Sequence, residues 1–251
     1  MSCNNPQGRV KSWPINRLNE KNAEVRIYTD IGYWYTSQMF VDQLDGLRDV
    51  EVLDVRINSF GGFASEGVAM YNALVRHPAK KRVWIDAAAY SAASIVAMAA
   101  SPGELRIAFN ARLMIHNAWN MAEGDHRDME KAAGILKMLD GTLAATYAKR
   151  ATAVSKEEFL ALMAAETWYD ADAAVAAGLA DEAFDAGAVE LPESDLNLVR
   201  EFKRPPADLI EKMQARSAAK GELPGRGPSP LAAGVEVAAR WAEIRNRNAA
   251  A

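Results

Sequence analysis

The sequence predicts an α/β fold in which parallel strands alternate with helices, and three observations support this prediction. Runs that alternate between apolar and polar residues, typical of strands, are interleaved along the chain with apolar residues at helical spacing. Half of the 251 residues are hydrophobic, enough for one substantial core. Because strand, helix and strand follow one another directly, they form βαβ units with right-handed crossovers.

The first such unit covers residues 23–59. AEVRIYTDIG predicts a strand that ends in a turn at Gly32. Residues 36–49 place apolar side chains near helical spacing, and VEVLDVRINS, residues 50–59, returns to strand character.

The pattern then repeats. Residues 61–80 predict a helix that stops before Pro78, and KRVWIDAAA supplies the next strand. Residues 94–100 have the composition of a buried helix. Residues 104–119 contain two short apolar runs separated by the turn-prone NAR.

Three helices are predicted further along the chain. A long helix is expected over residues 124–150. Ser155 and Glu158 have the spacing of a capping box ahead of FLALMAA, and Asp170 and Gly178 have the positions of an N-cap and a C-terminal stop.

These elements divide the chain into three parts: an N-terminal segment, residues 1–22, a folded domain, residues 23–190, and a mobile C-terminal extension, residues 191–251. Charged residues, proline and glycine predominate in the first part of the extension, and residues 231–247 could form a terminal helix.

Charge and cysteine content narrow the function classes. A net charge of −4 gives no general attraction to nucleic acid or to an anionic membrane, so we expect neither as a partner. The single cysteine, Cys3, suits a reducing compartment, and we expect a cytoplasmic protein because no segment has the character of a signal peptide or a membrane span.

Two features favour acyl-transfer chemistry, although each has an ordinary structural explanation. The pair Gly61 and Gly62 follows a strand, where it could present backbone N–H groups to an anion or simply form a tight turn. Ser94 opens the predicted buried helix, where small residues also serve close packing. A serine hydroxyl needs a base to become a nucleophile.

His116 is the best candidate for that base. It follows LMI at the end of a predicted buried strand, where a lone histidine is either a satisfied core residue or a site residue. His77 ends a helix as a capping or surface residue, and His126 lies in the polar EGDHRD. A carboxylate must orient the base, and Glu166 and Asp170 are both candidates that sequence order does not rank.

The segments RINSFGG, AASIVAMAAS, NARLMIHNAW and ETWYDADAAVAAGLAD, in that order, resemble the proteolytic subunit of the Clp protease. They resemble more closely its relatives in tailed phages, the ClpP-like prohead or head maturation proteases. The resemblance runs from Ala23 to Asp181 and implies a ClpP/crotonase-like fold of repeated β-β-α (βαβ) units. It also implies that residues 124–150 form a protruding handle helix through which subunits pair into a homo-oligomeric ring.

The resemblance assigns roles to individual residues. Ser94 occupies the serine of the family motif and would be the nucleophile, while Ser91 falls outside the motif; His116 would be the general base. Gly62 and Ile95 would donate the N–H groups of the oxyanion hole.

The acid of the triad departs from the family pattern. Glu166 falls where the Clp subunit has Asp, and Asp170 falls at a helix-capping position, so Glu166 is assigned to the triad.

The resemblance therefore implies a serine endopeptidase that needs no metal and no organic cofactor and that acts on protein or peptide substrates, here the scaffold and capsid proteins of a phage head. The nearest alternative is a housekeeping Clp subunit that works with an ATP-driven unfoldase. Two other classes are a crotonase-like acyl-CoA enzyme, which would place acid/base carboxylates around the site, and an inactive shell protein.

Overall fold

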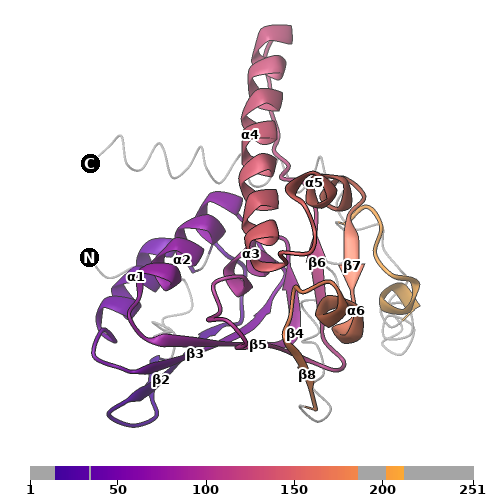
Figure 1. Ribbon diagram of the computed structural model, residues 1–251. Helices are drawn as coiled ribbons and strands as arrows, with labels where there is room; N and C mark the ends of the chain where they lie inside the picture. Colours follow the sequence, from indigo (N-terminus) through magenta and orange to yellow (C-terminus); the bar gives the residue numbers. More distant parts are fainter. Residues whose placement is uncertain (1–14, 34, 186–201, 212–251) are drawn as a thin grey trace, which may run out of the picture. The chain divides into compact units, whose positions relative to one another are not determined.

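The computed structural model describes residues 15–33, 35–185 and 202–211 and confirms the α/β prediction. Its eight strands form one sheet in the order β1-β2-β3-β4-β5-β8, with β6 paired to β4 and to β7 (Figure 1). The strands are β1 (Ile15–Arg17), β2 (Asn22–Ile27), β3 (Val52–Ser59), β4 (Lys80–Tyr90), β5 (Leu105–Ala108), β6 (Arg112–Ile115), β7 (Thr167–Tyr169) and β8 (Glu182–Phe184).

Six helices connect the strands in the described part of the chain. They are α1 (Ser37–Asp45), α2 (Ala64–Arg76), α3 (Ala92–Ala97), α4 (His126–Arg150), α5 (Lys156–Ala164) and α6 (Ala171–Ala176). None of these helices is both long and apolar enough to cross a membrane.

Local capping signals fix several helix starts as predicted. The Ser155 hydroxyl accepts the Glu158 N–H while the Glu158 side chain accepts the Ser155 N–H, which completes the capping box of α5. Asp170 accepts the Ala173 N–H at the start of α6, and Gly178 follows that helix with φ +72°.

The long strand β4 directs the chain toward the site because it changes partner along its length. Its first half pairs in parallel with β5 and its second half with β6, ending at Tyr90 opposite Met114. The pairing of β4 with β3 shifts register between Ile57 and Ser59, which marks an irregularity at the same level. The last residues of β4 therefore run beside β6 rather than β5.

Two antiparallel pairs complete the sheet. β1 pairs with β2, so part of the predicted N-terminal segment joins the sheet, and β7 pairs with β6. The sequence analysis did not anticipate β7 or β8. The predicted terminal helix, residues 231–247, lies outside the described residues.

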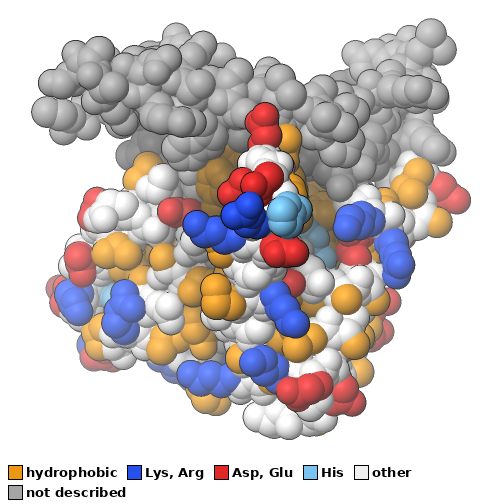
Figure 2. Space-filling view, turned by 90° about the horizontal axis from the view of Figure 1, so that it is seen from above, with side chains coloured by type: hydrophobic (Ala, Val, Ile, Leu, Met, Phe, Trp, Pro, Cys, Tyr) orange, Lys and Arg blue, Asp and Glu red, His pale blue; other side chains and the backbone are white. Residues whose placement is uncertain are grey.

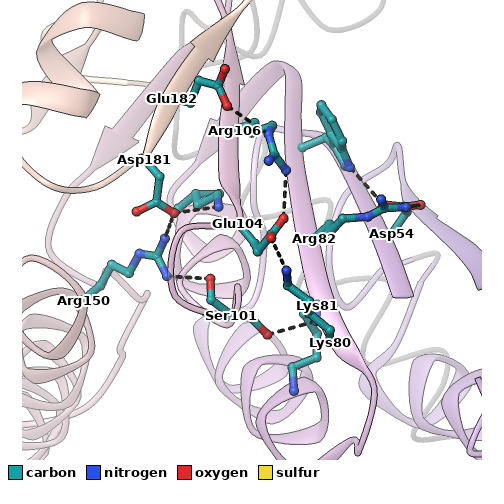
Figure 3. A network of polar contacts seen from close by, with 12 residues as sticks. Asp54, Lys80, Lys81, Arg82, Ser101, Glu104, Arg106, Arg150, Asp181 and Glu182 are labelled. Carbon is teal, nitrogen blue, oxygen red and sulfur yellow. Dashed lines mark hydrogen bonds and ion pairs between the residues drawn. The ribbon is translucent and has the colours of Figure 1, made fainter. Parts of the chain in front are cut away.

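One face of the sheet is apolar and the other carries ion pairs. Val55, Ile57 and Val83 are fully buried, and helices α1, α2 and α3 lie over one side of the sheet (Figure 1). At alternating positions, Arg82 donates to Asp54 in a two-bond ion pair (Figure 3).

A second polar connection joins the C-terminal end of α4 to the sheet. Arg150 pairs with Asp181, which precedes β8 (Figure 3). Arg150 also donates to the Ala100 carbonyl at 3.0 Å. All buried residues of α4, Leu143, Ala144 and Tyr147, belong to its second half. This half is therefore the part of α4 that contributes to the core.

Of the described residues, 15–33, 35–118 and 137–185 belong to one compact unit, and 119–136 and 202–211 belong to another. The first unit contains the whole sheet and every predicted site residue. Figure 2 shows basic, acidic and hydrophobic side chains interspersed on one face of the described residues.

Candidate active site

Ser91 occupies the turn between β4 and α3 in a strained backbone conformation. Its φ is +53° and its ψ is −124°, a combination that residues with a Cβ adopt rarely. Its N–H donates to the Met114 carbonyl of β6 at 2.9 Å. Such strain persists only where the surrounding structure imposes it, and it concentrates at functional sites.

His116 reaches Ser91 from the neighbouring strand. It directly follows β6, which lies beside the second half of β4, and its Nε2 is 2.7 Å from Ser91 Oγ. Both residues are partly exposed. This distance is within the range that a general base needs to take a proton from a hydroxyl.

Glu166 and His116 adjoin the same end of the β6–β7 ladder. The last pair of that antiparallel ladder joins Ile115 to Thr167, so His116 directly follows this pair along the chain and Glu166 directly precedes it. Glu166 is 8% exposed and has φ +54°. The Trp168 indole N–H donates to Glu166 Oε1 at 3.4 Å.

A single carbonyl links the base segment and the acid segment. Met163, near the end of α5, accepts the Glu166 N–H at 3.0 Å and the Asn117 N–H at 3.2 Å. The residues after β6 and before β7 are thereby held at one point of α5. Asp170 is exposed and caps α6, as predicted, whereas Glu166 adjoins the end of the β6–β7 ladder from which His116 continues.

The glycine pair lies directly against the Ser91 turn. A Cβ on Gly61 would be 2.7 Å from the Tyr90 carbonyl oxygen, 2.8 Å from Ser91 Cβ and 3.0 Å from the Ala92 nitrogen. Its φ of +98° also favours glycine. Only a residue without a side chain allows this close approach.

Gly62 presents its N–H in the way expected for an anion site. The Gly61 N–H donates to Ser59 Oγ at 3.1 Å, and the Phe63 N–H donates to the Ile31 carbonyl at 3.0 Å. Between them, the exposed Gly62 has no hydrogen-bond acceptor for its N–H among the described residues.

The structure does not bring Ser94, the predicted nucleophile, to His116; the serine next to His116 is Ser91. Ser94 lies inside α3, is fully buried, and hydrogen bonds to the Ser91 carbonyl at 2.6 Å and to the Tyr147 hydroxyl at 2.7 Å. A substrate cannot reach a side chain with no exposed surface. Ile95, the predicted oxyanion-hole donor next to Ser94, is likewise buried in α3. The residue that directly follows Ser91 is Ala92.

Sequence reasoning missed Ser91 because AAYSAAS contains two serines one helical turn apart. The buried helix was predicted from residue 94, whereas α3 begins at Ala92. The displayed serine is the one at the junction between strand and helix. The available signal was the position of Ser91 between the predicted strand KRVWIDAAA and the apolar helix that follows it.

Three aromatic side chains connect the segments of the site. The Phe60 and Tyr90 rings meet edge to face with centroids 4.9 Å apart, and Tyr90 meets Trp168 in the same way at 4.9 Å. Phe60 precedes Gly61, Tyr90 precedes Ser91, and Trp168 lies two residues after Glu166. The cluster therefore packs the three site segments against one another.

The two other histidines lie outside this arrangement. His126 is exposed at the start of α4, as predicted. His77 ends α2 as predicted, but it is buried, and its Nδ1 accepts the Ala79 N–H at 3.3 Å. Burial lowers the pKa of His77 below its usual value. Among the described residues, no three His, Cys, Asp or Glu side chains gather closely enough to hold a metal ion.

A comparison with protein families places this sequence in a known family. Residues 12–186, more than two thirds of the chain, match the family model described as Clp protease. The matched range includes the glycine pair, both serines, His116 and Glu166.

Proposed function

Because the chain belongs to the Clp protease family, whose members are serine peptidases, we propose that it hydrolyses peptide bonds with a Ser91–His116–Glu166 triad. The observation that carries this assignment is the 2.7 Å contact between His116 Nε2 and Ser91 Oγ, in a turn whose backbone is strained. Ser91 takes the role that the sequence analysis gave to Ser94.

In the proposed reaction, His116 accepts the Ser91 hydroxyl proton as Oγ attacks the carbonyl carbon of the scissile peptide bond. His116 then gives that proton to the leaving amine, which releases the first product and leaves an acyl-enzyme. A water molecule, deprotonated by His116, hydrolyses the ester and regenerates the Ser91 hydroxyl.

The negative charge on the substrate oxygen is proposed to be stabilised by the N–H groups of Gly62 and Ala92. Ala92 takes the role first given to Ile95, because the N–H next to the nucleophile is the one that can face the same carbonyl. The approach of Gly61 to Ala92 supports this pairing. In other enzymes, losing one oxyanion donor lowers kcat by about 10²–10³.

Glu166 is proposed to orient the His116 ring and to stabilise its charged form. The β6–β7 ladder ends at the pair Ile115–Thr167, and the fact that His116 and Glu166 both directly adjoin this pair supports this role. Its low exposure strengthens the interaction of its carboxylate with a neighbouring imidazolium, because little water screens the charge.

The Ser91–His116 contact also favours a peptidase over the two other classes. A crotonase-like enzyme has no need for a serine hydroxyl within hydrogen-bond distance of an imidazole. An inactive shell protein has no need for a strained turn that displays this hydroxyl.

For the biological role, we propose maturation of a phage head by a ring of subunits that cleaves scaffold and capsid proteins. Clp protease family members act on protein substrates and form oligomeric rings. The resemblance of the four motifs to the phage enzymes supports the finer role. The exposed apolar side chains of Ile135 and Met138 on α4 support a contact between subunits.

The catalytic assignment is tested by labelling the purified protein with a fluorophosphonate and locating the adduct by mass spectrometry. We expect an adduct on Ser91 that disappears in Ser91→Ala and in His116→Ala. Ser94→Ala removes the other hydroxyl of the motif, and any adduct that forms in this variant, even at a reduced rate, should still be located on Ser91. An adduct on Ser94 would overturn the assignment.

The biological role is tested with the assembled wild-type protein and no unfoldase. Cleavage of a phage scaffold protein under these conditions supports head maturation. Cleavage of folded proteins only after an ATP-driven unfoldase is added would instead support the housekeeping alternative.

A further inference from the structure

A buried chain of hydroxyl groups lies behind Ser91. Ser94 is fully buried and Tyr147, from the second half of α4, is 2% exposed. The Ser94 hydroxyl donates to the Ser91 carbonyl at 2.6 Å, and its oxygen is 2.7 Å from the Tyr147 hydroxyl. Because a serine hydroxyl has one proton, the Tyr147 hydroxyl must be the donor to Ser94.

This chain acts on a peptide group with a second function. The Ser91 carbonyl belongs to the same planar unit as the Ala92 N–H, so an interaction that fixes one end of the unit fixes the direction of the other. The Ser94 N–H also donates to this carbonyl, at 3.0 Å. The side chain and the backbone of Ser94 therefore hold the same oxygen.

The strain at Ser91 explains why such restraint is needed. Its φ of +53° combined with a ψ of −124° is costly for a residue with a Cβ, and rotation of the peptide between residues 91 and 92, which changes ψ, would move Ser91 into the less costly left-handed region. That rotation would turn the Ala92 N–H away from the substrate. Donation to the Ser91 carbonyl opposes the rotation.

We propose that Ser94 and Tyr147 are positioning residues for the oxyanion hole: they hold the peptide group between Ser91 and Ala92 so that the Ala92 N–H faces the reacting carbonyl. This inference rests on the proposed function of Ser91 as nucleophile. It gives α4, the helix that carries Tyr147, a direct connection to the catalytic turn.

The surroundings of Tyr147 suit a permanent donor. Burial raises the pKa of Tyr147 above its usual value, so its hydroxyl keeps its proton at neutral pH. The ring packs against Phe159 of α5 with centroids 5.5 Å apart. Successive hydrogen bonds polarise one another, so donation by Tyr147 also strengthens the bond from Ser94 to the carbonyl.

The test uses Tyr147→Phe, which removes one oxygen atom and keeps the ring. Two quantities are measured on the assembled enzyme: kcat and KM for a peptide amide substrate, and the inhibition constant of a matching peptide aldehyde, whose adduct carries the tetrahedral oxygen. We expect kcat to fall by about tenfold or more and aldehyde binding to weaken by a similar factor, with KM unchanged within about twofold.

Ser94→Ala should produce a larger loss of the same kind, because the carbonyl loses its direct donor. The double variant should be no worse than Ser94→Ala, since both residues act through one hydrogen bond. Tyr28→Phe is the matched control: it removes a tyrosine hydroxyl that donates to Asp86 at 2.5 Å, and it should leave kcat and aldehyde binding unchanged.

The possible results separate this inference from the proposed function. If wild-type protein is labelled on Ser91 but Tyr147→Phe keeps wild-type kcat and aldehyde binding, the positioning role is overturned and the triad stands. A purely structural role for Tyr147 would lower the melting temperature without changing either quantity, and this result would also overturn the inference. Absence of labelling on Ser91 in wild-type protein would overturn both proposals.

Discussion

Replacement of Gly61 by Ala should damage the site and the fold together, by amounts that follow from the structure. The new Cβ would lie 2.8 Å from Ser91 Cβ, whereas ordinary contact begins at 3.4 Å, so Ser91 must retreat by about 0.6 Å. A misplacement of 1 Å near reacting atoms costs about 10² in rate. We therefore expect kcat/KM to fall by about tenfold.

The cost in stability has two parts. A Cβ in the left-handed region costs about 1–2 kcal/mol, and crowding of a packed site costs about 1–3 kcal/mol more. The free energy of unfolding should thus fall by about 2–5 kcal/mol, measured by urea denaturation beside a fluorogenic peptide assay.

Gly103→Ala provides the matched control. Gly103 also has a positive φ, +76°, but nothing lies within 4 Å of its added Cβ. It should lose only the backbone part, about 1–2 kcal/mol, and keep full activity. The reasoning is refuted if Gly61→Ala retains wild-type kcat/KM and is destabilised no more than Gly103→Ala.

Three further changes have distinct expected results. Burial lowers the pKa of His77, so the unfolded chain binds the proton more readily than the folded protein does. The contribution of neutral His77 to the free energy of unfolding should therefore be fully present above pH 6.5 and decrease as pH falls below that value. The variant His77→Asn keeps an acceptor for the Ala79 N–H. Between pH 7.5 and pH 5.5, its free energy of unfolding, measured by urea denaturation, should fall less than that of the wild-type protein, and an equal fall in both proteins would contradict the prediction. Glu166→Gln should lower kcat strongly, whereas Asp170→Ala should cost about 1 kcal/mol of stability with kcat unchanged; similar activity losses in a peptide assay would contradict the assignment of the acid. Gly134→Ala in α4, where the new methyl meets nothing within 4 Å, should raise helix stability by about 0.5–1 kcal/mol, and a lower melting temperature would show that this part of α4 has a partner that excludes the methyl.

The sequence predicted features whose determinants lie close together in the chain. The capping box at Ser155 and the N-cap at Asp170 depend on residues three positions apart, and both are found in the structure. Strands β7 and β8 escaped prediction because three residues are too few to show an alternation.

The choice between Ser91 and Ser94 depended on long-range contacts. Ser91 follows an alanine and a tyrosine, and Ser94 follows two alanines, so their local surroundings in the sequence are nearly alike. The serine that lies at the end of β4 is the partly exposed one. The end of β4 is set by its pairing with β6, which lies more than twenty residues further along the chain. The place of Glu166 next to the last pair of the β6–β7 ladder likewise comes from the register of β7, which no local pattern specifies.

The shared Met163 carbonyl has a consequence for the order in which the protein becomes active during its synthesis. Ser91 and His116 leave the ribosome first, while Met163 and Glu166 follow about 50 residues later. Until that later segment folds, the proposed acid is absent and the loop after His116 lacks its anchor. A peptidase synthesised in this order becomes active only when its own domain is nearly complete. This delay protects the nascent chain and neighbouring nascent chains on the polysome from cleavage.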